Sequence, residues 1–474
     1  MPTTICRADG QRIDITAALG SEANVLSEHH QYMGEVAFKF HLWQRRAALE
    51  RLVALHVGVD AACVKTGHPK TWRAGSFNVA IPLLLFDCAD AAEDQHDKPT
   101  ETPENQQVRR VVLRCPLPMS CAETNYPGSI LEKMRCEVAS YVWMQRHCPE
   151  VRIPHLYGFG FPNSTPPMTK EPAKMRNLFR GISQIILALA RIPQPRIGAF
   201  CFNDDGTISL DNRPLTWDIV RSENEGAPRT MAVDKTYTDV GQYVLDTMTF
   251  HDERFLAAPH AAHNEADCKG QMAIRAFLRA VAPRFVDNSR RNGPFALFMA
   301  DQNATNIMVD SNWNVTGIFD LEWIVSAPID MPHTPRWLTW EQIDCIAGEG
   351  YGEYDRMRGA FMEVFKEEER HADTSALEAA HGGTLSSILD ASWVSKQVWF
   401  YRALLSSHAI DLLTERQLVP LHYPGEFPVP AVFSTWCTNP EETVAGKLAD
   451  RRAYEERILK LFAQITKAND TAAS

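Results

Sequence analysis

Residues 297–323, LFMADQNATNIMVDSNWNVTGIFDLEW, contain two aspartates and one asparagine whose types and spacing suit phosphoryl transfer. Asp301 and Asp320 each follow a short apolar run, and Asn306 lies five positions after Asp301. Phosphoryl transfer needs a carboxylate that orients the acceptor hydroxyl and hard oxygen ligands for Mg²⁺. The pattern therefore predicts Asp301 as the base and Asn306 and Asp320 as metal ligands.

Phosphoryl transfer also needs a cation that contacts the nucleotide phosphates. Arg114 lies inside the apolar run VVLRCP, where its long side chain could reach phosphates. Glu137 is polar among apolar neighbours on a predicted helix, and we expect it to pair with Arg114. Gly75 and Ser76 offer a weak phosphate loop, because the repeated glycines that would present several backbone N–H groups are absent.

The elements that must position these residues begin with an amphipathic helix over 37–56. Two apolar, β-rich runs, 72–87 and 109–118, predict a hairpin whose connection, 88–107, is acidic and polar. A strong helix is predicted over 129–148, with an apolar stripe at steps of three or four residues, formed by Ile130, Met134, Val138, Tyr141 and Met144.

The remainder predicts a larger and mainly helical region. A strand is expected at 151–160 and a Pro-rich linker at 161–175. The segments that follow predict a core helix at 176–192, a hairpin at 197–216, helices at 235–256 and 266–287, the strand–loop–strand–turn–strand of 297–323, and mostly helices over 340–470. We therefore expect an N-terminal lobe (1–160), a linker (161–175) and a helical C-terminal lobe (176–474).

Composition places the chain among soluble globular proteins, since 45% of its 474 residues are hydrophobic and 23% are charged. The net charge of −11 argues against a general nucleic-acid binder. No long apolar run or secretory signal is evident, which predicts a cytoplasmic protein without a membrane partner. The eleven scattered cysteines predict reduced thiols, and no cysteine–histidine set has zinc-site spacing.

At these residues the chain resembles the fungal branch of the aminoglycoside phosphotransferase and choline-kinase-like superfamily. The similarity includes RAGSFNVA, VVLRCP, IPHLYGFG, NRPLT, the segment 297–323, SAPIDMPHTPRWLT and STWCTNPEE. It implies an α+β, bilobal protein-kinase-like fold that binds ATP and Mg²⁺ in the cleft between its lobes. The resemblance gives Asp301, Asn306 and Asp320 the roles stated above, with Arg114 in place of a nucleotide-binding lysine and Glu137 as its partner.

Besides the arginine at position 114, the chain departs from the family pattern at two places. Met299-Ala300-Asp301 replaces the usual His-Gly-Asp, and the residues between Asp301 and Asn306 are unusual. From the site residues and the resemblance, the first hypothesis is a small-molecule phosphotransferase acting on a hydroxyl, with a cationic acceptor as one candidate.

The alternative is a kinase-like fold put to another use. It would be a pseudokinase, or a secondary-metabolism enzyme such as an aminoacyl-tRNA-dependent synthase of arginine-containing cyclodipeptides. That alternative needs a basic stripe for tRNA, for which Arg109, Arg110, Arg290 and Arg291 are the candidates. The aromatic residues Trp337, Trp340, Trp399, Phe400 and Tyr401 are expected to pack in the core rather than to form a substrate cage.

Overall fold

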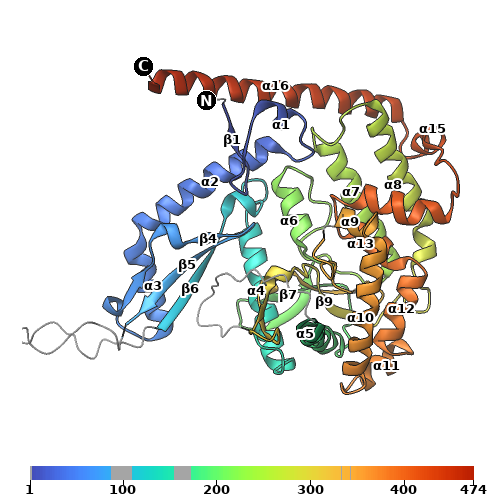
Figure 1. Ribbon diagram of the computed structural model, residues 1–474, viewed down its shortest axis with the longest axis horizontal. Helices are drawn as coiled ribbons and strands as arrows, with labels where there is room; N and C mark the ends of the chain where they lie inside the picture. Colours follow the sequence, from blue (N-terminus) through green and yellow to red (C-terminus); the bar gives the residue numbers. More distant parts are fainter. Residues whose placement is uncertain (1–2, 87–108, 154–171, 332–333, 342, 474) are drawn as a thin grey trace, which may run out of the picture.

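The computed structural model describes residues 3–86, 109–153, 172–331, 334–341 and 343–473 (Figure 1). It is a mixed α+β protein in which small β-sheets accompany a larger helical part. This agrees with the fold class predicted from the sequence at the level of secondary-structure content. None of the described helices is both long and apolar enough to span a membrane.

One sheet forms a separate small unit with two helices, which we call the small-sheet unit. Its strands are β3 (Val64–Thr66), β4 (Arg73–Ala74), β5 (Asn78–Leu85) and β6 (Arg109–Pro116), and its helices are α2 (Val25–Gln44) and α3 (Arg46–Val57). The central strand β5 pairs with all three other strands, each time antiparallel. Leu85 pairs with Arg109, so the predicted hairpin is confirmed.

The two faces of this sheet have different neighbours. Val79, Ile81 and Leu83 are buried in a core shared with α2 and α3. Because side chains alternate along a strand, Ala80 and its register partner Arg114 lie on the opposite face. The sheet thus directs Arg114 away from the small core and toward the rest of the molecule.

Two helices replace the single one predicted over 37–56. The helix α2 ends at Gln44 and α3 begins at Arg46, because Arg45 has a non-helical backbone with φ −99° and ψ 15°. The amphipathic pattern was correct in kind, since Leu42 and Val53 both enter the core of the small-sheet unit. The prediction of one continuous helix was wrong.

The helix α4 (Ser129–His147) buries part of its predicted apolar stripe, including Tyr141 and Met144, but it also buries charged residues. Met134 is 42% exposed, whereas Glu132, Lys133 and Glu137 are buried. Burial of charged side chains requires oppositely charged partners, and these come from distant parts of the chain. The helix was predicted correctly, but its orientation depends on those long-range ion pairs.

The larger part contains a second four-stranded sheet with the order β8-β7-β12-β9. Its strands are β7 (Gly198–Phe202), β8 (Ile208–Asn212), β9 (Ala296–Met299) and β12 (Ile324–Ala327). Between β9 and β12 the chain forms an antiparallel hairpin of β10 (Ile307–Val309) and β11 (Val315–Ile318). The predicted hairpin at 197–216 and the predicted strand order of 297–323 are both confirmed.

The rest of the larger part is mainly helical. Its helices are α5 (Pro172–Ala190), α6 (Trp217–Asn224), α7 (Val240–Ala257), α8 (Glu265–Phe285), α9 (Ile343–Ala347), α10 (Tyr351–Glu369), α11 (Ser375–His381), α12 (Leu385–Val394), α13 (Gln397–Leu404), α14 (Ile410–Leu413), α15 (Val429–Val432) and α16 (Pro440–Ala473). Trp399, Phe400 and Tyr401 are fully buried, as core packing predicts. The helix α5 begins inside the predicted linker, and most of the strand expected at 151–160 lies outside the described residues.

The C-terminal helix α16 packs on the N-terminal segment, which forms β1 (Ile5–Cys6), β2 (Arg12–Ile13) and α1 (Ile15–Leu19) (Figure 1). Ile458 and Phe462 share an apolar cluster with this segment. The Val25 backbone N–H donates to the Tyr454 hydroxyl at 2.8 Å. The first residues of the chain are therefore joined to its last helix rather than to the small sheet alone.

The cysteines differ in part from the expectation of reduced thiols. Of those that the structure describes, the residues from Cys6 to Cys437 are free with one exception. Cys63, which ends a short turn before β3, is disulfide-bonded. The prediction that all thiols are reduced was therefore wrong at this position.

Stability should fall in mild acid because a histidine is buried in its neutral form. His251 on α7 is 1% exposed, and its Nε2–H donates to the Leu404 carbonyl at 2.9 Å. Burial lowers the pKa of His251 from 6.5 to about 3, so the unfolded chain takes up a proton first as the pH falls. We expect a loss of about 2 kcal/mol between pH 7 and pH 5 from this group alone.

Urea unfolding at both pH values would measure this effect. His251→Gln keeps a donor for the Leu404 carbonyl but cannot titrate, so its unfolding free energy should change less with pH. An unchanged pH dependence in the variant would contradict this account of His251.

Candidate active site

The three predicted site residues of 297–323 are held together by backbone hydrogen bonds. Asp301 follows β9, where the Ala300 N–H donates to the Trp323 carbonyl at 2.8 Å. Asn306 ends a short 3₁₀ turn, and its carbonyl accepts from the Phe319 N–H at 3.0 Å. The segments that follow β9 and β11, which carry Asp301 and Asp320, therefore lie side by side, although the two strands belong to different sheets.

Asp320 has an unusual backbone for a residue with a side chain. Its φ of 59° and ψ of 55° lie in the left-handed region, which aspartate tolerates better than most residues. The carboxylate is 30% exposed at the start of the 3₁₀ turn η6 (Leu321–Trp323). Such backbone conformations persist where the surrounding structure enforces them, and they concentrate at functional sites.

Arg114 joins the small-sheet unit to the segment that carries Asp320. Its Nη1 contacts Glu137 Oε1 at 2.9 Å, which places the two residues together as the sequence predicts. Its Nη2 contacts Asp320 Oδ1 at 2.5 Å and Glu322 Oε1 at 3.4 Å. Residues from β6, α4 and the end of β11 thus meet in one ionic cluster, and the Arg114 side chain is only 8% exposed there.

A second cation and a third carboxylate complete this cluster. Lys133 on α4 is fully buried, and its Nζ contacts Glu322 Oε1 at 2.8 Å and Glu137 Oε2 at 3.7 Å. Asn78 on β5 donates from Nδ2 to Glu322 Oε1 at 3.3 Å. Lys133, Asn78 and Glu322 are not among the site residues predicted from the sequence. We call Arg114, Lys133, Glu137, Asp320 and Glu322 the cleft cluster.

The cleft cluster holds three carboxylates against two cations. Although burial opposes ionisation, Lys133 and Arg114 together lower the pKa of Glu322 to about 2. Burial and the neighbouring Glu322 raise the pKa of Asp320 to about 7, despite the attraction of Arg114. Two cations cannot balance three carboxylates, and the raised pKa of Asp320, the most exposed of the three, means that a proton partly balances its charge near pH 7. An added cation would be stabilised there.

Asp301 lies in a distinct environment beside Arg336. Its carboxylate is 21% exposed, and the Arg336 guanidinium lies 4.0 Å from Asp301 Oδ1. Burial raises the pKa of Asp301, while Arg336 and a side-chain hydrogen bond with Asn306 favour its charged form. Arg336 is 42% exposed, and Asp301 is its ion-pair partner within the described residues. Sequence reasoning missed Arg336, because nothing in its local pattern links it to Asp301.

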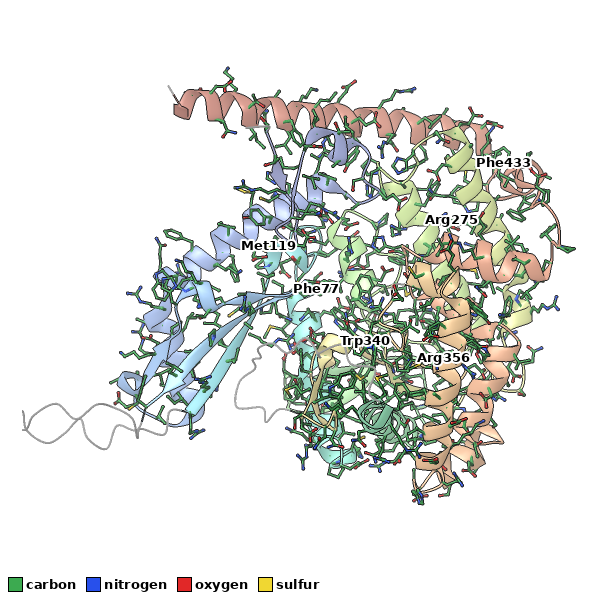
Figure 2. All side chains as sticks on the ribbon, viewed as in Figure 1. Phe77, Met119, Arg275, Trp340, Arg356 and Phe433 are labelled. Atoms are coloured by element: carbon green, nitrogen blue, oxygen red, sulfur yellow. The ribbon has the colours of Figure 1, made fainter. Side chains whose placement is uncertain are left out.

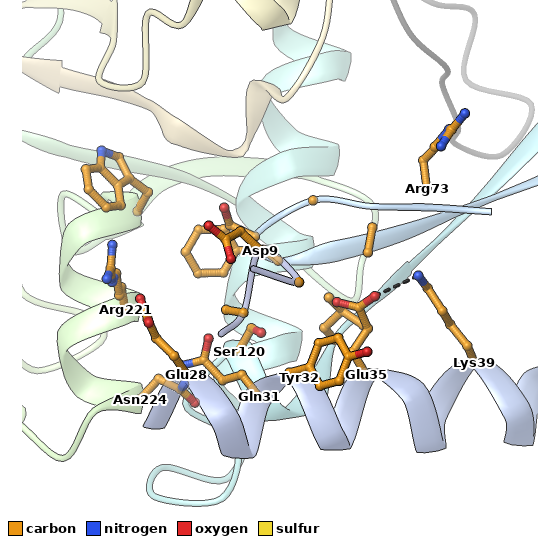
Figure 3. A pocket seen from close by; sticks show the side chains of 18 of the residues that line it. Asp9, Glu28, Gln31, Tyr32, Glu35, Lys39, Arg73, Ser120, Arg221 and Asn224 are labelled. Carbon is orange, nitrogen blue, oxygen red and sulfur yellow. Dashed lines mark ion pairs between the residues drawn. The ribbon is translucent and has the colours of Figure 1, made fainter. Parts of the chain in front are cut away.

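Gly75 and Ser76 form the turn between β4 and β5 and line a cavity of about 650 Å³ (Figure 3). The Gly75 N–H donates to the Asn78 carbonyl at 2.8 Å, so it is not available to a phosphate. The opposite wall is a polar face of α2, formed by Glu28, Gln31, Tyr32, Glu35 and Lys39. The turn is therefore connected to the cleft cluster only through β5, the strand that follows it.

Phe77 marks the contact between this turn and the site segment. It lies at the inner end of the small sheet in Figure 2, and its ring packs edge-on against Trp323 with centroids 5.2 Å apart. The next residue, Asn78, already belongs to the polar contacts of Glu322. A short apolar contact thus separates the cavity of Figure 3 from the cleft cluster.

The four arginines proposed as a basic stripe do not form one. Arg290 contacts Asp330 at 2.5 Å, and Arg291 contacts Asp239 at 2.6 Å, so both are neutralised. Arg109 and Arg110 are exposed at the start of β6 and have no ion-pair partner in the described ranges. The prediction of a four-arginine stripe was wrong, because acidic residues distant in sequence pair with its second half.

The oxygen ligands around Asp320 fit a magnesium ion only together with a bound phosphate. No group of three or more His, Cys, Asp or Glu side chains in the described residues is arranged to hold a metal. Asn306 and Asp320 would supply one amide and one carboxylate oxygen, a set that Mg²⁺ accepts when phosphates complete its shell. The exposed carboxylate of Asp320, which the two cations do not fully balance, supports a cation at this position.

Comparison of the chain with protein-family models, with curated proteins and with solved structures finds no match.

Proposed function

We propose that the chain has a bilobal, protein-kinase-like fold and acts in the cytoplasm as an ATP- and Mg²⁺-dependent phosphotransferase on a small-molecule hydroxyl. The observation that carries the proposal is the contact of Arg114 with both Glu137 and Asp320. A cation–carboxylate pair on the sheet and helix of one lobe would thereby face the metal-binding aspartate of the other lobe. The active forms of protein kinases require this combination.

Each site residue has a distinct role in this proposal. Asp301 would orient the acceptor hydroxyl and accept its proton. Asn306 and Asp320 would hold Mg²⁺, which when bound neutralises charge on the nucleotide phosphates. Arg336 would stabilise the transferring phosphoryl group, because it is an exposed cation beside Asp301. Arg114 would turn from Asp320 to the phosphates.

Stabilisation by nucleotide tests the proposal. Mg-ATP at about ten times its dissociation constant adds about 1.4 kcal/mol to the folded state, which we expect to raise Tm by about 1–2 °C for a chain of this length. ATP without Mg²⁺ should have a smaller effect. Asp320→Asn should abolish the magnesium-dependent part, since asparagine tolerates the same backbone but lacks the charge.

Asp310→Asn is the matched control for this test. Asp310 is an exposed turn residue of the same segment, where its carboxylate accepts from the Asn312 and Asn314 N–H groups. Its variant should respond to Mg-ATP like the wild type. Failure of any nucleotide to stabilise the wild-type protein would refute the phosphotransferase proposal.

A second candidate is a kinase-like fold that binds a cationic group instead of Mg-ATP. The observation in its favour is that Arg114 already contacts three carboxylates, which leaves it poorly placed for phosphate in this conformation. A guanidinium or ammonium group could then bind to the Asp320 carboxylate, as in a repurposed enzyme or a pseudokinase. Free arginine stabilising the wild type, but not Asp320→Asn, would favour this candidate over the first.

The transfer-RNA form of this second candidate makes a separate prediction. Of the original four arginines, Arg109 and Arg110 are the two without an ion-pair partner in the part of the chain that the structure describes. The purified protein would carry nucleic acid, seen as absorbance at 260 nm, and Arg109→Ala/Arg110→Ala would remove it. Protein free of nucleic acid at low salt would exclude this form, since phosphate contacts strengthen as salt is lowered.

A further inference from the structure

Lys133 is the cation of the cleft cluster that cannot leave it. Its side chain is fully buried, its Nζ lies 2.8 Å from Glu322 and 3.7 Å from Glu137, and it also contacts Asn78 Oδ1 at 3.4 Å. The Arg114 guanidinium reaches the 30% exposed carboxylate of Asp320. The two cations therefore differ in their access to the cleft.

If Lys133 were absent, removal of Arg114 from the cluster would leave Glu322 and Glu137 without a nearby cation. Both carboxylates are buried, and an unpaired buried charge is strongly unfavourable. With Lys133 in place, each carboxylate retains a cation within 4 Å. The Asn78 amide gives Glu322 a further donor. Arg114 can therefore break its contacts with Asp320 and Glu322 without stranding either buried carboxylate.

We propose that Lys133 and Glu322 form a positioning pair that allows Arg114 to exchange Asp320 for an anionic ligand in the cleft. The pair fixes α4 to the turn η6, and it leaves the Arg114–Asp320 contact as the part of the cluster that changes. Lys133 touches no ligand in this account and acts through Arg114. This inference rests on the proposed function for the identity of the ligand, a nucleotide phosphate, but not for the geometry of the pair.

Lys133→Met tests the proposal, because methionine has similar length and no charge. Arg114 should then be drawn fully to Glu322 and Glu137, and a crystal structure of the ligand-free variant should show its contact with Asp320 lost. The affinity for ATP, measured by calorimetry at a temperature where the variant is folded, should fall about tenfold. An Arg114–Asp320 contact that is unchanged in the variant would overturn the proposal.

The double variant Lys133→Met/Glu322→Gln separates positioning from folding. It removes both charges of the pair, so it should recover the stability lost in the single variant. It should also recover ATP affinity, because Arg114 is then shared between Glu137 and Asp320 alone. Recovery of Tm in the double variant, with affinity equal in all three proteins, would show that the pair is only structural.

The two readouts also distinguish this inference from the proposed function. A wild-type protein that binds no nucleotide refutes the function, whereas the crystal structures of the ligand-free variants still decide the positions of Arg114. If Lys133→Met does not fold, the ligand-free structures of the double variant and the wild type are compared instead. The expected result is that Arg114 contacts Asp320 in both proteins. Loss of that contact in the folded double variant would count against the proposal.

Discussion

Replacing Arg213 with methionine is expected to lower the free energy of unfolding by about 3–5 kcal/mol. Arg213 is 1% exposed and contacts Glu132 on α4 at 2.8 Å and Glu223 on α6 at 2.5 Å. The substitution leaves two buried carboxylates, for which Arg229 is the remaining nearby cation, 2.7 Å from Glu223. Glu132 is 4.0 Å from Arg229 and would lose most of its compensation.

Urea unfolding of the variant measures this loss, with Arg196→Met as the control. Arg196 is 44% exposed and forms a longer pair with Asp211 at 3.4 Å, so its loss should change stability by less than about 1 kcal/mol. A similar small effect for Arg213→Met would contradict the claim that buried ion pairs hold α4 in place.

The pKa of Glu223, although raised by burial, is lowered overall by hydrogen bonds from Arg213 and Arg229, and the stability from this ionised state should diminish in acid.

Under the proposed function, Asp301→Asn is expected to reduce kcat for phosphoryl transfer by about 10²–10⁴, the usual contribution of general base catalysis. Asparagine retains the size of the side chain but cannot accept the proton. Because Asp301 is not proposed to bind nucleotide, KM for ATP should change little, which identifies a loss confined to the transition state. The release of ADP in the presence of hydroxyl-bearing acceptors provides the measurement.

Asp310→Asn again serves as the control, because Asp310 is exposed on the hairpin turn away from the candidate site. It should retain wild-type kcat. Equal kcat in the wild type and in Asp301→Asn, together with intact nucleotide binding, would remove Asp301 from the role of base. Arg336→Gln should raise KM or lower kcat by a smaller factor, since Arg336 is half exposed.

The candidate site residues that were predicted from the sequence are those that depend on local pattern. Strand ends, where aspartate and asparagine are favoured, gave the positions of Asp301, Asn306 and Asp320. A cation inside the apolar run VVLRCP and a carboxylate among apolar neighbours on a helix suggested that Arg114 and Glu137 pair, and they contact at 2.9 Å. Their roles in catalysis stay predictions.

The parts that the sequence did not predict depend on contacts between distant residues. Lys133 and Glu137 are spaced like a solvated i,i+4 pair, and Glu322 was interpreted as a structural residue after Asp320. Lys133, Glu137 and Glu322 are buried because β6 packs beside η6. No local sequence pattern predicts this long-range contact. A possible signal was available in α4, because Glu137 lies four residues before Tyr141 and therefore on the side of the helix that the apolar stripe occupies.

The cationic candidates show the same limit. Arg290 and Arg291 look like a basic cluster in sequence, but Asp330 and Asp239 neutralise them from forty and fifty-two positions away. The net charge of −11 makes such pairing common for surface arginines. Local clusters of basic residues therefore overestimate the positive surface of this protein.

A crystal structure with Mg²⁺ and a non-hydrolysable ATP analogue tests the central claim most directly. The account predicts phosphates between Arg114 and Asp301, with Mg²⁺ on Asn306 and Asp320 and the Arg114–Asp320 contact broken. An analogue bound elsewhere, or density for none at saturating concentration, would contradict it.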